Sequence, residues 1–264
     1  MKKYLFIFTI IIATQIANAQ FGGGDGTENN PYQIATKKHL YALADSVNNS
    51  APYPAPYPAP NWSAGKYFKL MNHITDPITE VIGYDINNQF QGNFDGQDHA
   101  IALAINMPTA DYVGLFGCIQ NATIKNVIVN GYVNGNNIVS GIAGFILNNA
   151  AITDCVNAAN ITGNVYVAGI VALACYNTTI ENCINSGDIT GSNLVAGIAG
   201  SIGETPPIDI LITINNYKKK GIIKENADGF TGVNILQSEG KEITYPINKE
   251  VIEELNNSSI ESDE

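Results

Sequence analysis

The feature that most constrains the fold is a phrase of about 28 residues that recurs between Tyr112 and Gly203. Each copy opens on a box of the form Gly-x-x-Gly or Gly-x-x-Ala, and 27, 28 and 28 residues separate the leading glycines, which are Gly114, Gly141, Gly169 and Gly197. A second phrase keeps this period, opening on Ile124, Ile152 and Ile180 and closing on Gly135, Gly163 and Gly191. Self-similarity at a fixed period of roughly 20 to 50 residues predicts stacked units, none of which buries its apolar face alone.

Within each copy the apolar residues form short runs rich in Ile and Val, bounded by Gly, Asn, Thr and Ser, and no helical period is sustained. At about 3.3 Å per residue, one copy has a contour of about 90 Å, which suffices for three short strands and three turns. The sequence therefore predicts an all-β fold, a parallel β-helix (solenoid) of about 28-residue coils that stack at the inter-strand spacing of about 4.8 Å.

Equivalent positions of successive coils should then form columns. Two aliphatic columns are expected to fill the interior: Ile124, Ile152 and Ile180, and Val133, Ile161 and Ile189. Two polar columns are expected at turns, where side chains can satisfy backbone groups: Asn126, Asp154 and Asn182, and Asn157 and Asn185. The repeated glycines at 135, 163 and 191 fit turn positions that need a positive φ.

The residues from Ile180 to Gly191 read Ile-Glu-Asn-Cys-Ile-Asn-Ser-Gly-Asp-Ile-Thr-Gly. Together with the glycine boxes, this string resembles the GLUG motif repeats of bacterial surface proteins, and the resemblance extends from about Gly24 to Ile223. It implies a β-helix in an adhesin-like or secreted protein, and it implies no particular biochemical activity. Copies depart from the pattern at Val127, Val129, Ala159 and Ala172.

Residues 1–19 have the pattern of a secretory signal peptide. Lys2 and Lys3 precede an apolar run that is too short for a stable bilayer anchor, and small residues predict cleavage after Ala19. No later apolar run reaches about 18 residues, so no membrane span is expected in the mature chain. The absence of arginine and the net charge of −11 argue against nucleic acid as a partner. A secreted or cell-surface location is expected.

Residues 20–49 are expected to form a leader and an N-terminal capping α-helix. Thr36 is a candidate N-cap. An apolar stripe follows at helical spacing, formed by Leu40, Leu43, Ala44 and Val47. Such a helix would cover the open first coil and block its strand edges.

Residues 50–62 form a Pro- and Tyr-rich loop, in which Ala-Pro-Tyr-Pro is repeated and which is expected to be polyproline-like. Tyr53, Tyr57 and Trp62 are the candidate ligand contacts, because their rings could face a sugar or a partner protein. The alternative is an inserted loop whose aromatic residues pack on the nearby coil.

The rest of the chain divides by how well it keeps the period. Irregular first coils are expected at 63–111, the repeats at 112–203, a last coil with an insertion at 204–232, and a divergent cap with an acidic tail at 233–264. The last coil is aligned by matching Ile214 and Ile223 to Ile180 and Ile189.

No zinc-binding His-Glu-x-x-His pattern and no Gly-x-Ser-x-Gly elbow is present, so no catalytic residue, metal site or cofactor is predicted. The residues Asp25, Glu28 and Asn29 lack the spacing of a known calcium loop. Asp154 and Glu181 nearly share an edge and would be the carboxylate pair of a carbohydrate-active enzyme, or else solvated and turn-capping groups.

The cysteines leave two interpretations open. Cys155 and Cys183 occupy one column, so they could form a disulfide or remain a ladder of small buried side chains. Cys118 and Cys175 lie at different offsets from their glycine boxes and need not meet.

The hypothesis is a secreted or cell-surface, non-enzymatic β-helix that displays a rigid repeat surface and binds an extracellular glycan or protein. Alternatives are a carbohydrate-active β-helix enzyme and a purely structural repeat fragment of a longer protein. End-to-end self-association through the last coil is also possible.

Overall fold

The computed structural model describes residues 20–50, 61–202, 222–225, 231–236 and 242–247. The chain divides into two compact units, residues 1–215 and residues 216–264, which are taken separately. The predicted signal peptide, Tyr53 and Tyr57 of the Pro/Tyr-rich loop, Ile214 and the acidic tail lie outside the described residues.

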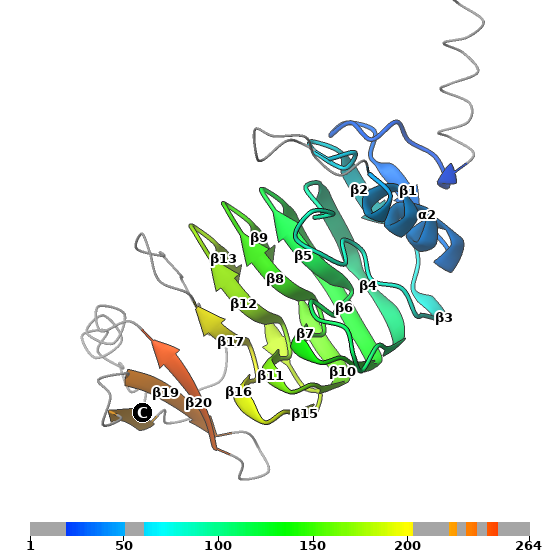
Figure 1. Ribbon diagram of the computed structural model, residues 1–264. Coiled ribbons are helices and arrows are strands. Elements are labelled where there is room, and N and C mark those ends of the chain that lie inside the picture. Colours follow the sequence, from blue (N-terminus) through cyan, green and yellow to red (C-terminus); the bar gives the residue numbers. More distant parts are fainter. Residues whose placement is uncertain (1–19, 51–60, 203–221, 226–230, 237–241, 248–264) are drawn as a thin grey trace, which may run out of the picture. The chain divides into compact units, whose positions relative to one another are not determined.

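The first unit is a parallel β-solenoid of about five turns with one helix, which confirms the predicted fold (Figure 1). Its elements are β1 (Tyr32–Ile34), α2 (Lys37–Asn48), β2 (Tyr67–Leu70), β3 (Ile74–Ile78), β4 (Asn93–Asn106), β5 (Phe116–Gln120), β6 (Thr123–Asn134), β7 (Asn137–Ser140), β8 (Ala143–Leu147), β9 (Ala151–Thr153), β10 (Val156–Thr162), β11 (Val165–Ala168), β12 (Val171–Cys175), β13 (Thr179–Glu181), β14 (Ile184–Asn185), β15 (Ile189–Thr190), β16 (Asn193–Ala196) and β17 (Ala199–Ile202).

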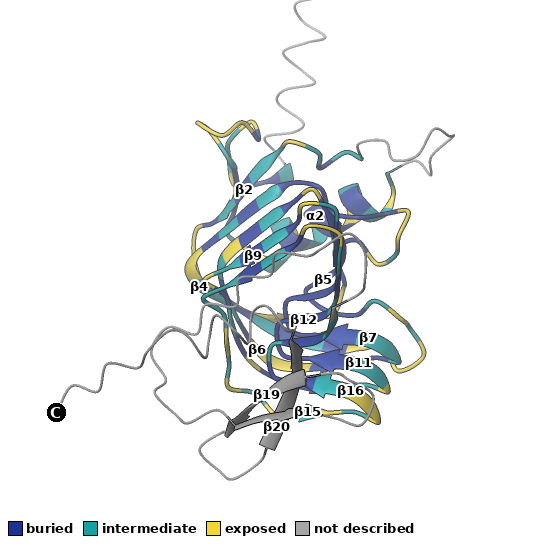
Figure 2. Ribbon diagram, turned by 90° about the vertical axis from the view of Figure 1, so that its left-hand side faces the viewer, coloured by how far each residue is buried: buried dark blue, intermediate teal, exposed yellow. Residues whose placement is uncertain are grey.

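Three parallel sheets form the walls of the solenoid. The largest has the order β1-β2-β4-β6-β10-β14, with β3, β9, β13 and β15 attached; the others have the orders β7-β11-β16 and β5-β8-β12-β17. Equivalent residues pair across the coils, as in the pairs Ile124–Ile152 and Ile152–Ile180. In Figure 2, buried residues alternate with partly exposed ones along β2, β4 and β9, as expected for strands with one face on a core.

The predicted interior ladders are confirmed. Ile124, Ile152 and Ile180 are at most 1% exposed, as are Val133 and Ile161 of the second ladder. Ile189, in the last coil, is partly buried against the same core. In the irregular first coils the interior is filled by larger rings that contact one another: Phe68, Phe90, Phe94 and Phe116.

The first polar column stands at a left-handed corner: Asp154 and Asn182 lie between strands, as predicted for a turn, whereas Asn126 lies within β6. Asn126, Asp154 and Asn182 have φ of 54°, 53° and 53°, the left-handed conformation that Asn and Asp tolerate best among non-glycine residues. Their side chains also bond between coils: the amide of Asn126 donates to Asp95 Oδ1 at 3.0 Å, and that of Asn182 to Asp154 Oδ1 at 3.2 Å.

The glycine column at Gly135, Gly163 and Gly191 was assigned to positive φ, and this prediction is wrong, because none of the three has a positive φ. Their role is close packing. A Cβ added at Gly135 would lie 2.8 Å from the side chain of Val139, and one at Gly191 would lie 2.7 Å from Val167. The glycines therefore leave room for the valine column of the adjoining sheet.

A second left-handed corner carries bulky side chains instead. Ile138, Tyr166 and Leu194 have φ of 58°, 55° and 52°, although a β-branched residue rarely adopts this conformation. The carbonyl of Ile138 lies 2.9 Å from where a Cβ of Gly144 would be. The closing glycine of the box thus admits the backbone of this corner.

The second predicted asparagine column, Asn157 and Asn185, satisfies backbone groups as expected, but Asn157 lies inside β10 and not at a turn. It is fully buried; its Nδ2 donates to Ala159 O at 2.9 Å and to Asn185 Oδ1 at 2.7 Å, and its Oδ1 accepts from Ala159 N at 3.1 Å. A Cβ at Gly141 would lie 2.2 Å from Asn157 Oδ1. The opening glycine of the box therefore makes room for this inward amide.

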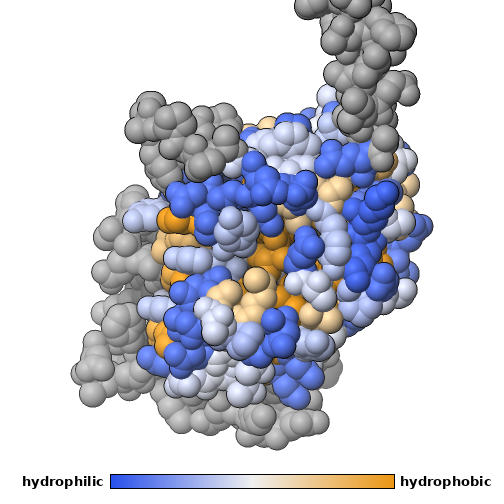
Figure 3. All heavy atoms as spheres, turned by 45° about the vertical axis from the view of Figure 1, so that its right-hand side comes forward, coloured by the Kyte–Doolittle hydropathy of each residue, from blue (hydrophilic) through white to orange (hydrophobic). Residues whose placement is uncertain are grey.

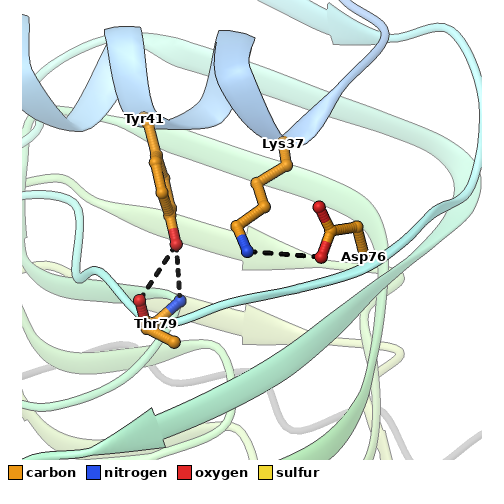
Figure 4. Close-up of polar contacts among 4 residues, drawn as sticks. All are labelled: Lys37, Tyr41, Asp76 and Thr79. Carbon is orange, nitrogen blue, oxygen red and sulfur yellow. Dashed lines mark hydrogen bonds and ion pairs between the residues drawn. The ribbon is translucent and has the colours of Figure 1, made fainter.

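Helix α2 begins at the predicted N-cap, where the Thr36 side chain accepts from the His39 amide. Its buried residues are the predicted stripe, Leu40, Leu43, Ala44 and Val47, and they join the solenoid core. Its polar side contacts β3 and the residue that follows it: Lys37 Nζ lies 3.3 Å from Asp76 Oδ1, and Tyr41 OH lies 2.9 Å from Thr79 Oγ1 (Figure 4).

The free edge of β1 is covered by the leader and not by the helix. The Gly22 amide donates to Gln33 O at 2.8 Å, and the Gln33 amide donates to Gly23 O at 2.9 Å. Helix α2 therefore covers the core of the first coil, and the leader covers its strand edge. The helix alone had been expected to cover both.

The second unit contains β18 (Ile222–Glu225), β19 (Thr231–Leu236) and β20 (Glu242–Ile247) in an antiparallel sheet. Ile223 pairs with Val233 of β19. The sequence alignment had placed Ile223 in the parallel column of Ile189, so at this residue the pairing differs from the expectation. Among the described residues, no helix is long and apolar enough to cross a membrane.

Candidate binding face

The second half of β4, β6 and β10, continued by β14 and β15, presents a continuous outer surface, which we call the ladder face. Because side chains alternate along a strand, Ile101, Val129 and Ile161 point into the core and their neighbours point outward. The outward residues form four columns: Ala100, Ile128, Val156 and Ile184; Ala102, Asn130, Ala158 and Ser186; Ala104, Tyr132, Asn160 and Asp188; and Asn106, Asn134, Thr162 and Thr190.

The ladder face differs in chemistry across its width. The column that contains Ile128 and Val156 is aliphatic, and the column that contains Asn134 and Thr162 is polar. Between them stands Tyr132, which is 47% exposed and pairs with Ala104 on one side and Asn160 on the other. Small neighbours leave the ring of Tyr132 open to solvent.

The amides of the ladder face connect neighbouring coils. Asn134 Nδ2 donates to Asn106 Oδ1 at 2.8 Å, and the Asp188 amide donates to Asn160 Oδ1 at 3.3 Å. Asp188 is the only charged residue among the sixteen positions of the face. The face is therefore a regular, nearly uncharged surface on a chain whose net charge is −11.

The sequence analysis did not single out Tyr132, although it placed the neighbouring Val133 in an interior column, which implies that Tyr132 points outward. The signal was present in β6, where the buried Val129 and Val133 alternate with Asn130, Tyr132 and Asn134.

Of the predicted ligand contacts, only Trp62 lies within the described residues. It is half-buried among the rings of Phe21, Tyr32 and Phe68, with ring centroids 6.0 to 6.2 Å away. Lys66 Nζ lies 4.7 Å from the centre of the Trp62 ring. This position matches the alternative reading, in which the aromatic residue packs on the nearby coil.

The predicted carboxylate pair lies on adjacent coils. The Asp154 amide donates to Glu181 O at 3.0 Å, and Asp154 Oδ1 accepts from Asn182, as a turn-capping role requires. In the leader, Asp25 Oδ1 accepts from the amide and hydroxyl of Thr27, and these bonds hold the pKa of Asp25 below its ordinary value. In the described part of the chain, no group of three or more His, Cys, Asp or Glu residues could hold a metal ion.

Cys155 and Cys183 are free thiols in neighbouring coils. Each thiol donates to a carbonyl of its own coil, Cys155 to Thr153 O and Cys183 to Glu181 O, both at 3.2 Å. Burial raises the pKa of Cys155 well above its ordinary value, and burial raises that of Cys118 as well. Burial therefore favours the neutral form of Cys155 and Cys118, whereas a hydrogen bond with Cys155 lowers the pKa of Cys183. Free thiols in neighbouring coils match the predicted ladder of small side chains.

A second apolar cluster lies on the outer side of β5, β8 and β12. It consists of Cys118, Phe145 and Leu147, with Tyr112, Ile138, Leu173 and Cys175 packed against them. Because Phe145 and Leu147 are only 9% and 6% exposed, this cluster is largely closed to a ligand. Figure 3 shows one side of the molecule, where hydrophobic residues lie in a recess bordered by hydrophilic ones.

Comparison with known proteins finds distant relatives, and no family model matches the chain. A protein assigned as a Gly-rich membrane protein in Evansella cellulosilytica is 32% identical over 127 residues, which are 44% of this chain and 13% of that protein. Halomucin of Haloquadratum walsbyi is 30% identical over 158 residues, 46% of this chain and 2% of halomucin.

Among solved structures, a protein assigned as an immunoglobulin A1 protease from Bacteroides ovatus is similar with a TM-score of 0.49 and 18% identity, covering 73% of this chain and 67% of that one. The chain matches only a small fraction of the length of its two sequence relatives. Their activities as whole proteins therefore do not carry over directly.

Proposed function

We infer that this protein is a secreted or cell-surface β-solenoid without enzymatic activity, which displays the ladder face to bind an extracellular glycan or protein. The observation that carries this proposal is the ladder face itself, a surface of regularly paired strands with one charged residue among sixteen positions. Such a surface offers repeated hydrogen-bonding groups and an exposed tyrosine, which suit adhesion. It lacks the clustered carboxylates with which a glycosidase cleaves its substrate.

Two further observations support a surface location. The repeats resemble the GLUG motif of bacterial surface proteins, and a relative over 127 residues is assigned as a membrane protein. The first 19 residues have the pattern of a signal peptide with cleavage after Ala19. We propose that the repeats are of the GLUG type and that the mature chain begins at Gln20.

The test is binding of purified residues 20–264 to arrays of glycans and extracellular-matrix proteins, with the same wells assayed for released sugar. The expected result is saturable binding to an intact ligand. Absence of any binding on both arrays would refute the proposal. Mass spectrometry of the exported protein checks the mature N-terminus separately.

Release of sugar would instead favour the carbohydrate-active alternative. Asp154→Asn and Glu181→Gln are then the variants to assay, because these side chains lie on adjacent coils. If release persists in both variants, this carboxylate pair is not the source of the activity.

A further inference from the structure

We propose that the ladder face binds a linear, uncharged polysaccharide that runs across the coils along the solenoid axis, with one sugar ring lying on Tyr132. This inference rests on the proposed display function and names its ligand class and its central residue. The ligand should be extended, because the polar column beside Tyr132 continues through four coils as Asn106, Asn134, Thr162 and Thr190.

The chemistry of the face matches both sides of a sugar ring. A pyranose has an apolar surface of C–H groups and a rim of hydroxyl groups. The face offers an aliphatic column through Ile128, Val156 and Ile184, of which Ile184 is 49% exposed, and a polar column through Asn134 and Thr162 that runs parallel to it. These two columns are six residues apart along a strand, about 20 Å, so a chain that lies along the axis on Tyr132 reaches only the polar column, which is two residues from Tyr132, or about 7 Å. The hydroxyl rim of the sugar then faces the polar column, and its C–H surface lies on the tyrosine ring.

Tyr132 stands between these columns as a platform. Its ring is 47% exposed, and its neighbours along the column and beside it include Ala104 and Ala158. The small Ala104 and Ala158 leave space for a sugar ring beside the aromatic face, and Asn160 on the other side can donate to or accept from it. The phenol hydroxyl can exchange further hydrogen bonds with the ligand. The site is open in the structure and requires no rearrangement of the backbone.

The spacing and charge of the face argue against two other ligands. Equivalent groups recur at about 4.8 Å, the distance between strands, whereas an extended peptide advances by about 3.3 Å per residue and cannot present the same group to every coil. A pyranose unit linked in a straight chain advances by about one ring length, which is comparable with the coil spacing. An anionic polymer would meet no basic side chain on the face and a net charge of −11 on the chain.

The experiment is calorimetric titration of purified residues 20–264 with cellohexaose, xylohexaose, mannohexaose and chitohexaose, with the matching disaccharides, and with heparin. At least one hexasaccharide should bind, about tenfold or more tightly than its disaccharide, because more coils are engaged. Its affinity should change less than about twofold between low and high salt, since no ion pair is formed. Heparin should not bind.

Two variants locate the site. Tyr132→Ala should weaken hexasaccharide binding by about tenfold or more. Tyr176→Ala is the matched control, because Tyr176 is also exposed, at 46%, but lies at a corner outside the ladder face, and binding should be unchanged. Ala158→Glu, which places a bulky charge on the floor of the face, should also abolish binding while far-ultraviolet circular dichroism remains that of the parent.

The outcomes separate this inference from the display function. If matrix proteins bind on the array but none of the four hexasaccharides does, the display function stands and the inference fails. The inference also fails if only heparin binds, or if Tyr132→Ala binds as tightly as Tyr176→Ala. If neither array gives binding, both proposals fail.

Discussion

The buried amide of Asn157 provides the sharpest test of how the coils are held together. Replacing Asn157 by valine removes three hydrogen bonds, two with Ala159 and one with Asn185. Valine fits the space, because Val129 occupies the same column one coil earlier and is fully buried. At about 1 kcal/mol for each bond, Asn157→Val should lower the free energy of unfolding by about 3 kcal/mol, out of the roughly 5 to 15 kcal/mol that holds a typical domain.

The coil that already contains valine suggests how this loss can be relieved. Residue 131, the partner of Ala159 in that coil, is glycine with φ of 95°, a conformation that alanine avoids. The coil with Asn157 thus has an alanine with negative φ two residues later, and the coil with Val129 has a glycine with positive φ two residues later. The second change Ala159→Gly, which alone should cost about 0.5 to 1 kcal/mol, should restore stability to Asn157→Val.

The measurement is urea unfolding followed by circular dichroism, with the free energy extrapolated linearly to water. Asn130→Val, on the exposed side of β6, is the control and should change stability by less than about 0.5 kcal/mol. The reasoning is refuted if Asn157→Val costs no more than this control. It is also refuted if the costs of Asn157→Val and Ala159→Gly simply add in the double variant.

Three further predictions concern the corners and the glycine boxes. Gly141→Ala should lower the free energy of unfolding in urea by more than about 3 kcal/mol, because its Cβ would meet an amide oxygen and a backbone carbonyl. Gly65 has open space around it but a φ of 67°, so Gly65→Ala should cost only about 1 to 2 kcal/mol. Equal costs for the two variants would contradict this. Burial of Asp95 alone would raise its pKa, but hydrogen bonds to the carboxylate outweigh burial and lower it. The stability that this carboxylate contributes is therefore present above about pH 4 and lost as the pH falls further. Asp95→Asn should reduce the loss of unfolding free energy at acid pH, and an unchanged pH dependence would exclude the effect. Asn182→Asp places a second carboxylate beside Asp154 and should destabilise by about 1 kcal/mol, less in high salt; a loss that is independent of salt would point to another cause.

The period of 28 residues was sufficient to predict the solenoid and its interior ladders, and the capping helix was predicted separately from Thr36 and the apolar stripe that follows it. Ile124, Ile152 and Ile180 are identical residues at identical intervals, so coils of constant length place them directly above one another. The corner at Asn126 was predictable because asparagine is one of the few residues that favour a left-handed backbone.

Other features depend on contacts that the sequence does not record. Ile138 adopts a left-handed backbone against its own preference, so tertiary register overrides local propensity at that corner. Gly135 was assigned to a turn, but it is needed because Val139 approaches it from the neighbouring sheet. That Tyr132 stays exposed depends on the small residues Ala104 and Ala158 of the adjacent coils, which the structure places beside it.

The site was therefore less predictable than the fold. The aromatic residue chosen from the sequence, Trp62, packs against Phe21 and Tyr32 at the start of the solenoid. The exposed aromatic residue lies instead within a repeat, where Tyr132 occupies a position that is Ala104 and Asn160 in the adjacent coils. A single substitution within a column does not alter the period, so periodicity alone does not draw attention to it.

Pairing of each strand with its counterpart in the next coil orients the hydrogen bonds between coils along the solenoid axis. A force applied along that axis would separate neighbouring strands one bond at a time, and coils would detach in sequence and not all together. Each detached coil would replace about 4.8 Å of solenoid by about 90 Å of extended chain, a lengthening of roughly twentyfold. Under the proposed display function, the solenoid would act as an extensible tether between a cell and its ligand, dissipating load coil by coil.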